Sequence, residues 1–245
     1  MDYLMLFSLL FIVLSLACLY LIYVGLNRGL KSFGENAGKR IKSRFILAIV
    51  IWLIVLSGLS LSGFLNDFSN FPPRMLIVLV VPLPIIIFLS FSKTLASILA
   101  DVPPQWLFYI QSFRIVVEVL LWGLFLDNLL PVQMTFEGRN WDVLVGITAP
   151  VFAYLCFSGH KYRRRLAIVW NVFGLLLLLN ILVIAILSMP SPIRVFMNEP
   201  ANVIVARFPF VLLPGILVPI AYTMHIFSLR QLLVYKDQKL FAKAS

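Results

Sequence analysis

QWLFYIQSFRIVVEVLLWGLFLDNLLP, residues 105–131, is the stretch that decides the fold. It is long and apolar enough to cross a bilayer, since about 20 helical residues span the hydrocarbon core. Its first half nevertheless carries Gln111, Arg114 and Glu118, whose spacing places them on one face of a helix. A charged side chain at membrane depth costs roughly 2.5 kcal/mol or more, so we expect this face to point into a bundle and to serve a function.

The composition of the whole chain is typical of a membrane protein. Of its 245 residues, 62% are hydrophobic and 12% are charged, and the mean hydropathy is +1.01. Soluble domains are about half apolar and about a quarter charged. The net charge of +10 is spread in short clusters between apolar runs, which indicates membrane topology signals rather than a nucleic-acid-binding patch. We therefore expect the lipid bilayer, and no nucleic acid, as a partner.

Seven apolar runs predict an all-α, polytopic transmembrane helix bundle that forms one domain, residues 1–245. Prolines at positions 82 and 84 interrupt the third run, and prolines at 214 and 219 interrupt the seventh. Proline removes a backbone donor, so each of these two spans is either a continuous or a broken helix. The predicted spans are residues 3–27, 45–66, 75–92, 105–130, 142–158, 166–188 and 209–229.

The distribution of basic residues predicts the orientation of these seven spans. Of the 20 Lys and Arg residues, fifteen fall in the segments on one side of the membrane in this topology and four fall on the other side. The remaining one, Arg114, lies within a span. Because cytoplasmic loops collect Lys and Arg, the N-terminus is predicted outside and the C-terminus inside. Of the connections, we expect residues 28–44 and 93–104 to be inner loops, the first made irregular by Gly34 and Gly38. The apolar VIVA run in the outer loop 189–208 predicts a short helix that lies at the membrane interface or dips in, rather than a solvated loop.

Helical rise places polar residues of other spans at the depth of the central face. A hydrated substrate or proton site would use Glu118 as the titrating group, and Arg114 would hold an anion or tune the pKa of Glu118. The alternative is an internal ion pair between Arg114 and Glu118 that only joins helices. The candidate binding residues within the membrane are Gln111, Arg114, Glu118, Asn171, Asn180 and His225.

The outer segment FEGRNWD, residues 136–142, is the densest cluster of functional groups in the chain. Glu137, Arg139 and Asn140 are candidates for an extracytoplasmic binding surface, together with polar residues of the loop 189–208. The alternative is a salt-bridged lid over the bundle, with Asp142 as the N-cap of the fifth span.

No cofactor, metal site or catalytic residue is predicted. Haem ligation by His160 and His225 is the one cofactor hypothesis, and a packed histidine is the simpler interpretation. The two cysteines, Cys18 and Cys156, lie in apolar runs without metal-ligand spacing. Sequence motifs of known soluble enzymes are absent, and the seventh span has no lysine for a Schiff base.

Three segments, PVQMTFEGRNWDVLVGITAP, WNVFGLLLLLNI and the run from FPFVLLPG through HIFSLRQL, support a family resemblance. Together they resemble a group of uncharacterised bacterial multi-pass membrane proteins, over roughly the C-terminal three fifths of the chain. The resemblance implies a location in the bacterial inner membrane and carries no activity with it.

Three functions agree with these observations. The first is a small transporter or permease, whose ligand would be a small solute and whose path would follow the Gln111, Arg114 and Glu118 face. The second is a non-catalytic subunit that docks on a membrane-protein partner. The third is a membrane-embedded enzyme or lipid-handling protein, in which Arg114 or Arg139 would hold a lipid headgroup.

Overall fold

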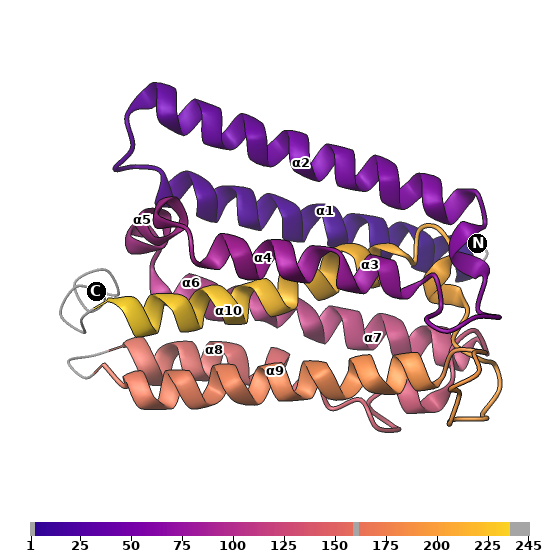
Figure 1. Cartoon of the computed structure of the whole chain (residues 1–245). Coiled ribbons are helices and arrows are strands. Elements are labelled where there is room, and N and C mark those ends of the chain that lie inside the picture. The colour runs from indigo at the N-terminus through magenta and orange to yellow at the C-terminus, as the bar shows by residue number, and fades with distance from the viewer. Residues whose placement is uncertain (1–2, 159–161, 236–245) are drawn as a thin grey trace.

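The computed structural model describes residues 3–158 and 162–235. The described chain is helical, and most of its helices run along one common axis, as Figure 1 shows. These helices are α1 (Tyr3–Gly29), α2 (Glu35–Leu61), α3 (Leu76–Val80), α4 (Pro82–Ser90), α6 (Pro104–Tyr109), α7 (Phe113–Leu126), α8 (Val143–Phe157), α9 (Arg164–Leu187) and α10 (Val218–Val234). Short turns between them are η1 (Phe64–Asn66), η2 (Ile110–Ser112), η3 (Val132–Met134), η4 (Ile204–Ala206) and the π-helical η5 (Leu213–Leu217).

The all-α class is confirmed, and several helices have the length and composition of membrane spans. Within the described residues five continuous helical stretches qualify, where the lipid core demands about 20 apolar residues. They are Tyr3–Gly29, Glu35–Leu61, Pro104–Leu126, Arg164–Leu187 and Leu213–Val234. A sixth candidate is the bent pair Leu76–Ser90 and Lys93–Asp101, whose halves meet at 81°, and α8 is apolar but shorter.

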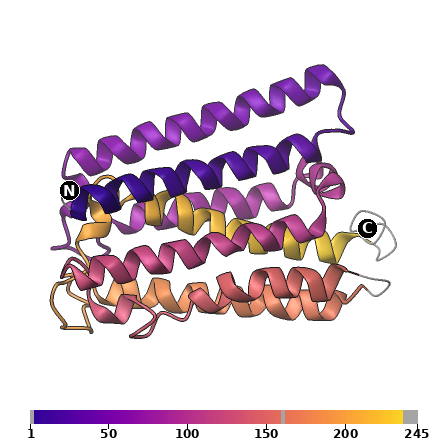
Figure 2. The same ribbon diagram turned by 180° about the vertical axis from the view of Figure 1, so that it is seen from behind.

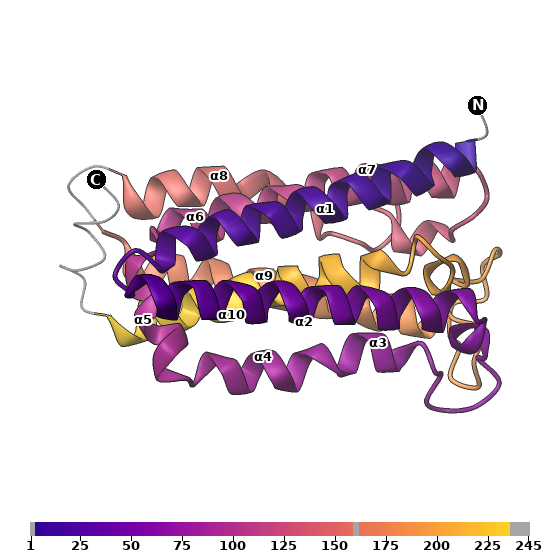
Figure 3. The same ribbon diagram turned by 90° about the horizontal axis from the view of Figure 1, so that it is seen from above.

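The connection predicted at residues 93–104 is mostly helical, and the chain bends sharply just before it, after Ser90. Instead of a loop, the chain forms α5 (Lys93–Asp101), which turns across the end of the bundle (Figure 3). Ser92 starts this helix by accepting a hydrogen bond from the Leu95 N–H at 3.0 Å. Leu76–Ser90 itself passes the two prolines without a sharp bend, because Pro82 takes the first position of α4, where no N–H is needed.

The second helix also begins earlier than the predicted span at residue 45. Its first residue is Glu35, so that Gly38 lies inside the helix rather than in an irregular loop. Glu35 stabilises the positive end of the helix dipole, and its carboxylate pairs with Lys39 one turn later at 2.6 Å. The basic residues that follow therefore lie on helical turns that extend α2 beyond its apolar part.

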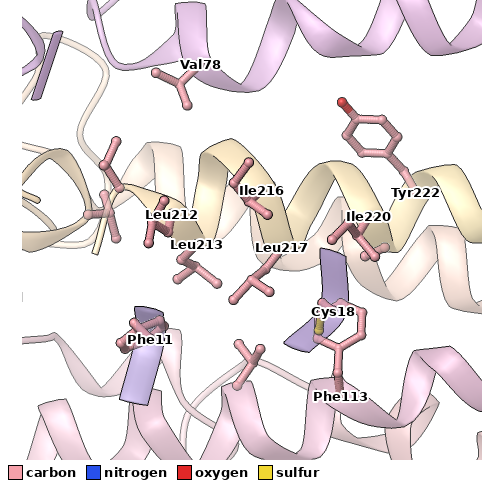
Figure 4. Close-up of a cluster of buried hydrophobic side chains, with 14 of the residues drawn as sticks. Phe11, Cys18, Val78, Phe113, Leu212, Leu213, Ile216, Leu217, Ile220 and Tyr222 are labelled. Carbon is pink, nitrogen blue, oxygen red and sulfur yellow. The ribbon is translucent and has the colours of Figure 1, made fainter. Parts of the chain in front are cut away.

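The helix formed by η5 and α10 lies at the centre of the bundle. Figure 4 shows Leu213, Ile216 and Leu217 of this helix between Phe11 and Cys18 of α1 on one side and Val78 of α3 on the other. Phe11 meets Phe210 edge to face, with ring centroids 5.5 Å apart. By contrast, most of α2 is exposed, and its buried residues are Gly38, Leu56 and Ser60.

A proline in the central helix creates the contact that holds α2. Pro219 has no N–H to donate to the carbonyl of Gly215 four residues earlier. That carbonyl instead accepts a hydrogen bond from Trp52 Nε1 of α2 at 2.8 Å. Leu56 packs directly on Gly215, where a Cβ atom would lie 2.5 Å from the leucine side chain. Close approach of α2 to this turn therefore requires glycine.

The helical connections divide between the two ends of the bundle. The α1–α2 turn, α5, the start of α9 and the end of α10 gather at one end, which we call the α5 end (Figures 1 and 2). The start of α1, η1, the end of α7 and η4 lie at the other, the η4 end. The VIVA run contributes the single helical turn η4, whose three residues are buried, as expected of a segment that is not a solvated loop.

We expect Trp52→Phe to destabilise the protein by about 1–3 kcal/mol, because it leaves the buried Gly215 carbonyl without a partner. Trp122→Phe is the matched control, since the Trp122 indole donates to the exposed carboxylate of Glu137 and its loss should change stability little. The measurement is the free energy of unfolding in mixed micelles. Equal effects of the two variants would contradict this account of α2 docking.

Candidate functional site

The polar face predicted in residues 105–131 points into the bundle. Gln111 in η2 is 0% exposed, and Arg114 and Glu118 in α7 are 1% and 2% exposed. Gly146 of α8 allows this close packing, because a Cβ atom there would lie 2.9 Å from the Ile115 backbone nitrogen. Lipid therefore has no access to the three polar side chains.

The connection between α7 and α8 does not stay at the η4 end. Residues 132–142, which we call the descending segment, run back along α7, and α8 begins midway along the bundle (Figure 1). Glu137 meets Trp122, Asn140 meets Glu118, and Asp142 meets Arg114. Arg114 precedes the end of α7 by about 12 residues, which places Asp142 about 18 Å below that end. The segment predicted as an outer loop thus folds back along α7.

Alternate residues at the end of the descending segment face opposite sides. Asn140 and Asp142 are buried, whereas Arg139 and Trp141 are exposed. The inward pair completes what we call the charged cluster: Arg114, Glu118, Asn140 and Asp142.

Arg114 is paired with Asp142, and not with Glu118 as the ion-pair alternative predicted. Its Nη1 atom lies 2.9 Å from Asp142 Oδ1, and both side chains are buried. Among the described residues Glu118 is not an ion-pair partner of Arg114. Arginine before glutamate is the weaker order for an i, i+4 pair, and the descending segment supplies a better-placed carboxylate. Asp142 stands at the predicted N-cap position of α8, but its side chain makes no capping hydrogen bond and pairs with Arg114 instead.

Asn140 connects the Glu118 carboxylate to the backbone of Asp142. Its amide nitrogen donates to Glu118 Oε1 at 2.6 Å and Oε2 at 2.7 Å. Its amide oxygen accepts from the backbone N–H of Asp142 at 3.1 Å. Asn140 therefore fixes Glu118 in position and orients the residue that holds Arg114.

One edge of the Arg114 guanidinium makes no hydrogen bond within the described part of the chain. Nε and Nη2 are buried and have no hydrogen-bond partner in the described part of the chain. These two nitrogens share one edge of the planar group, which is the fork that binds two oxygens of a carboxylate. Buried donors are nearly always satisfied, so this edge requires water or a ligand.

A cavity of about 70 Å³ adjoins the cluster. Arg114, Glu118 and Asp142 are its charged wall, and Asn202 is a further polar lining residue. Each water needs roughly 10–15 Å³ of such volume, so the cavity is large enough for several waters or a small solute. Its apolar wall includes Leu121 of α7, Leu178 and Leu182 of α9, and Leu213, Leu217 and Val218 of the central helix.

Three other residues predicted to bind within the membrane, Gln111, Asn171 and His225, lie apart from the charged cluster and nearer the α5 end. His225 Nδ1 lies 2.9 Å from Asn171 Oδ1, and the Asn171 amide donates to Ser228 Oγ at 3.0 Å. The His225 ring packs on Gly174, where a Cβ atom would lie 2.3 Å from Cε1. Gln111 donates to the Ala221 carbonyl at 3.1 Å. Gln111, Asn171 and His225 thus join η2, α9 and α10. None of these three side chains lines the cavity.

The predicted outer binding surface is also divided. Glu137 is exposed and accepts from Trp122 Nε1 at 2.8 Å, while the Arg139 guanidinium lies 5.2 Å from the Phe196 ring centre. Asn180 donates to the Arg139 carbonyl at 2.9 Å, which joins α9 to the descending segment. In the loop 189–208, the charges pair locally, with Arg194 and Glu199 3.1 Å apart.

The haem hypothesis is untested, because His160 lies outside the described residues. Within the described ranges, no group of three or more His, Cys, Asp or Glu side chains has a metal-binding arrangement. Cys18 and Cys156 are buried free thiols.

Asp142→Asn is expected to destabilise the protein by about 3–5 kcal/mol, because it leaves the buried Arg114 charge without a counter-charge. The double variant Arg114→Met/Asp142→Leu removes both charges and should lose much less. Asp67→Asn is the control, because Asp67 pairs with Arg74 in an exposed position and should have little effect. Thermal unfolding in detergent measures all three. A double variant as unstable as Asp142→Asn would contradict the importance of the uncompensated charge.

Comparison with known proteins gives a family without an assigned activity. A family model described as "Domain of unknown function (DUF8737)" matches residues 72–233, which is more than half of the chain and includes the whole charged cluster. Neither the curated proteins nor the solved structures gave a match. The chain, a helical protein with several apolar helices of spanning length and a buried Arg–Asp pair, belongs to the DUF8737 family.

Proposed function

We propose that the protein is a small transporter of the bacterial inner membrane, with a path through the cavity beside Arg114. The single observation that carries this proposal is a buried guanidinium with one unpaired edge next to that cavity. Ionisable groups within a membrane are costly, and they usually mark substrate or proton pathways.

The threading that supports this function has seven crossings. They are the five long helices, the bent pair and α8, with the start of α1 at the η4 end and the end of α10 at the α5 end. The α5 end carries the basic residues of the α1–α2 turn, of α2 and of the α9 start, among them Arg28, Lys39 and Arg164. Positive residues favour the cytoplasm, so the N-terminus is outside and the C-terminus inside.

The descending segment supports a path rather than a closed bundle. Irregular backbone at membrane depth is stable only where protein buries it or where it lines a hydrated cavity. Here the segment supplies Asp142 to the cavity wall opposite α9 and the central helix. Interrupted segments of this kind often form transport sites.

The roles of the cluster residues follow from their charges. Arg114 holds the anionic group of a solute, and Asp142 keeps the guanidinium in place. Glu118 carries a proton between the two sides, because one guanidinium and two carboxylates leave an excess negative charge that a proton removes. Asn140 positions Glu118 through both carboxylate oxygens.

One observation favours a second function, a subunit of a membrane complex. The outward face of the descending segment presents Glu137, Arg139 and Trp141, and Trp141 is 57% exposed. Charged residues on the side of a bundle are more stable against a protein partner than against lipid. A partner that co-purifies constantly and is lost on Arg139→Ala would favour this function over transport.

The orientation is tested by cysteine labelling in intact cells. Asn70→Cys at the η4 end should react with a membrane-impermeant maleimide, and Thr94→Cys in α5 should react only after lysis. Both native cysteines are buried and serve as the background. The reverse pattern would overturn the orientation.

Transport is tested with the purified full chain in vesicles that contain a pH-sensitive dye. Addition of one class among short carboxylates, amino acids, sugars and inorganic anions should acidify the lumen, and Glu118→Gln should abolish this proton movement. Glu137→Gln is the matched control at an exposed position and should behave as the native protein. Unchanged proton movement in Glu118→Gln, or none with any solute class, would reject the proposal.

A further inference from the structure

The guanidinium of Arg114 is divided between two tasks. Nη1 binds Asp142 at 2.9 Å, while Nε and Nη2 remain buried and unpaired among the described residues. Two parallel N–H groups on one planar edge match the two oxygens of a carboxylate in geometry and charge. A halide or a single carbonyl oxygen would satisfy this edge less completely.

The cavity that Arg114 lines limits the size and polarity of a ligand bound beside this residue. Its volume of about 70 Å³ accommodates a few heavy atoms, by comparison with the roughly 10–15 Å³ that one water occupies. Apart from the charged cluster and Asn202, the walls are apolar, with leucines from α7, α9 and the central helix. A short alkyl tail fits these walls, whereas a sugar or an amino acid would leave polar groups unpaired there.

The charge balance decides when an anion can enter. The charges of Arg114 and Asp142 cancel, so an ionised Glu118 would leave the cavity with a net negative charge. In the described residues α9, η5 and α10 contribute uncharged residues to the lining. His225 of α10 is within electrostatic range of Arg114, but it faces Asn171 outside the cavity. Glu118 is therefore the group whose proton would offset the charge of an entering anion.

We infer that the site binds a short-chain monocarboxylate together with one proton. The carboxylate accepts from Nε and Nη2 of Arg114, its alkyl tail lies against the apolar wall, and the proton resides on Glu118. One anion and one proton enter and leave together, so the step moves no net charge. This inference deepens the proposed transport function, and it supplies the substrate class and the coupling ion.

The test measures the affinity of the purified full chain in detergent for propionate. Calorimetric titrations at a series of pH values give this affinity. One proton taken up with each anion makes the affinity rise about tenfold per pH unit decrease, wherever propionate is ionised and Glu118 is ionised in the free protein. Propionamide, which has the same shape and no charge, is the ligand control. A pH-independent affinity of the native protein would overturn the coupling.

Binding of neutral propionic acid would give the native protein the same pH dependence as binding of the anion with a proton on Glu118. The variant Glu118→Gln distinguishes these two explanations. The glutamine mimics the protonated carboxyl, so this variant should bind propionate with an affinity independent of pH. A tenfold rise per pH unit that persists in Glu118→Gln would reject the role of Glu118. His225→Asn should keep the native dependence, and loss of the dependence there would assign the proton to His225.

Arg114→Lys tests the bidentate edge while it preserves the positive charge beside Asp142. Lysine is a point donor without a planar fork, so the affinity for propionate should fall on the order of 10- to 100-fold. Size-exclusion chromatography establishes that this variant is folded, and the Glu118→Gln result decides independently if it is not. Native-like affinity in folded Arg114→Lys would overturn the assignment of the carboxylate to this edge.

The binding and transport results separate the two proposals. Propionate binding without any proton movement in vesicles would refute transport and leave the carboxylate site intact. Proton movement driven by another solute class, with no propionate binding at any pH, would refute the carboxylate site and leave transport intact.

Discussion

The buried ion pair between Arg114 and Asp142 is the interaction on which the rest of the site depends. A guanidinium at this depth requires a counter-charge, and α7 does not provide one in good geometry. The descending segment therefore comes about 18 Å down from the end of α7 to deliver Asp142. This descent shortens α8, places Asn140 on Glu118 and leaves the cavity between α7, α9 and the central helix.

The central helix shows how the bundle stays tightly packed around such a site. Its prolines and Gly215 release a carbonyl that Trp52 then binds, so a helix interruption becomes a point of attachment for α2. Further along, Gln231 donates to the carbonyls of Leu99 and Val102 at 2.7 Å and fixes the end of α5. Both ends of the central helix are thus anchored, while the cavity lies beside its middle.

Much of the framework follows from the sequence, because hydrophobic length and helical spacing are local properties. The apolar runs predict the long helices, and the spacing of Gln111, Arg114 and Glu118 predicts their common buried face. The partner of Arg114 does not follow, since it depends on the path of an irregular segment. The helix in residues 93–101 does not follow from apolar length, because its nine residues are too few to span a bilayer.

The central claim is that a paired Arg114 and a separate Glu118 line a hydrated cavity in the middle of the membrane. A cryo-electron microscopy map of the full chain in lipid nanodiscs at a resolution that shows ordered water tests it most directly. The account predicts Asp142 in contact with one side of the Arg114 guanidinium and density for water or a small anion on the other. A map with Asp142 at the bilayer surface, or with Arg114 facing lipid, would contradict it.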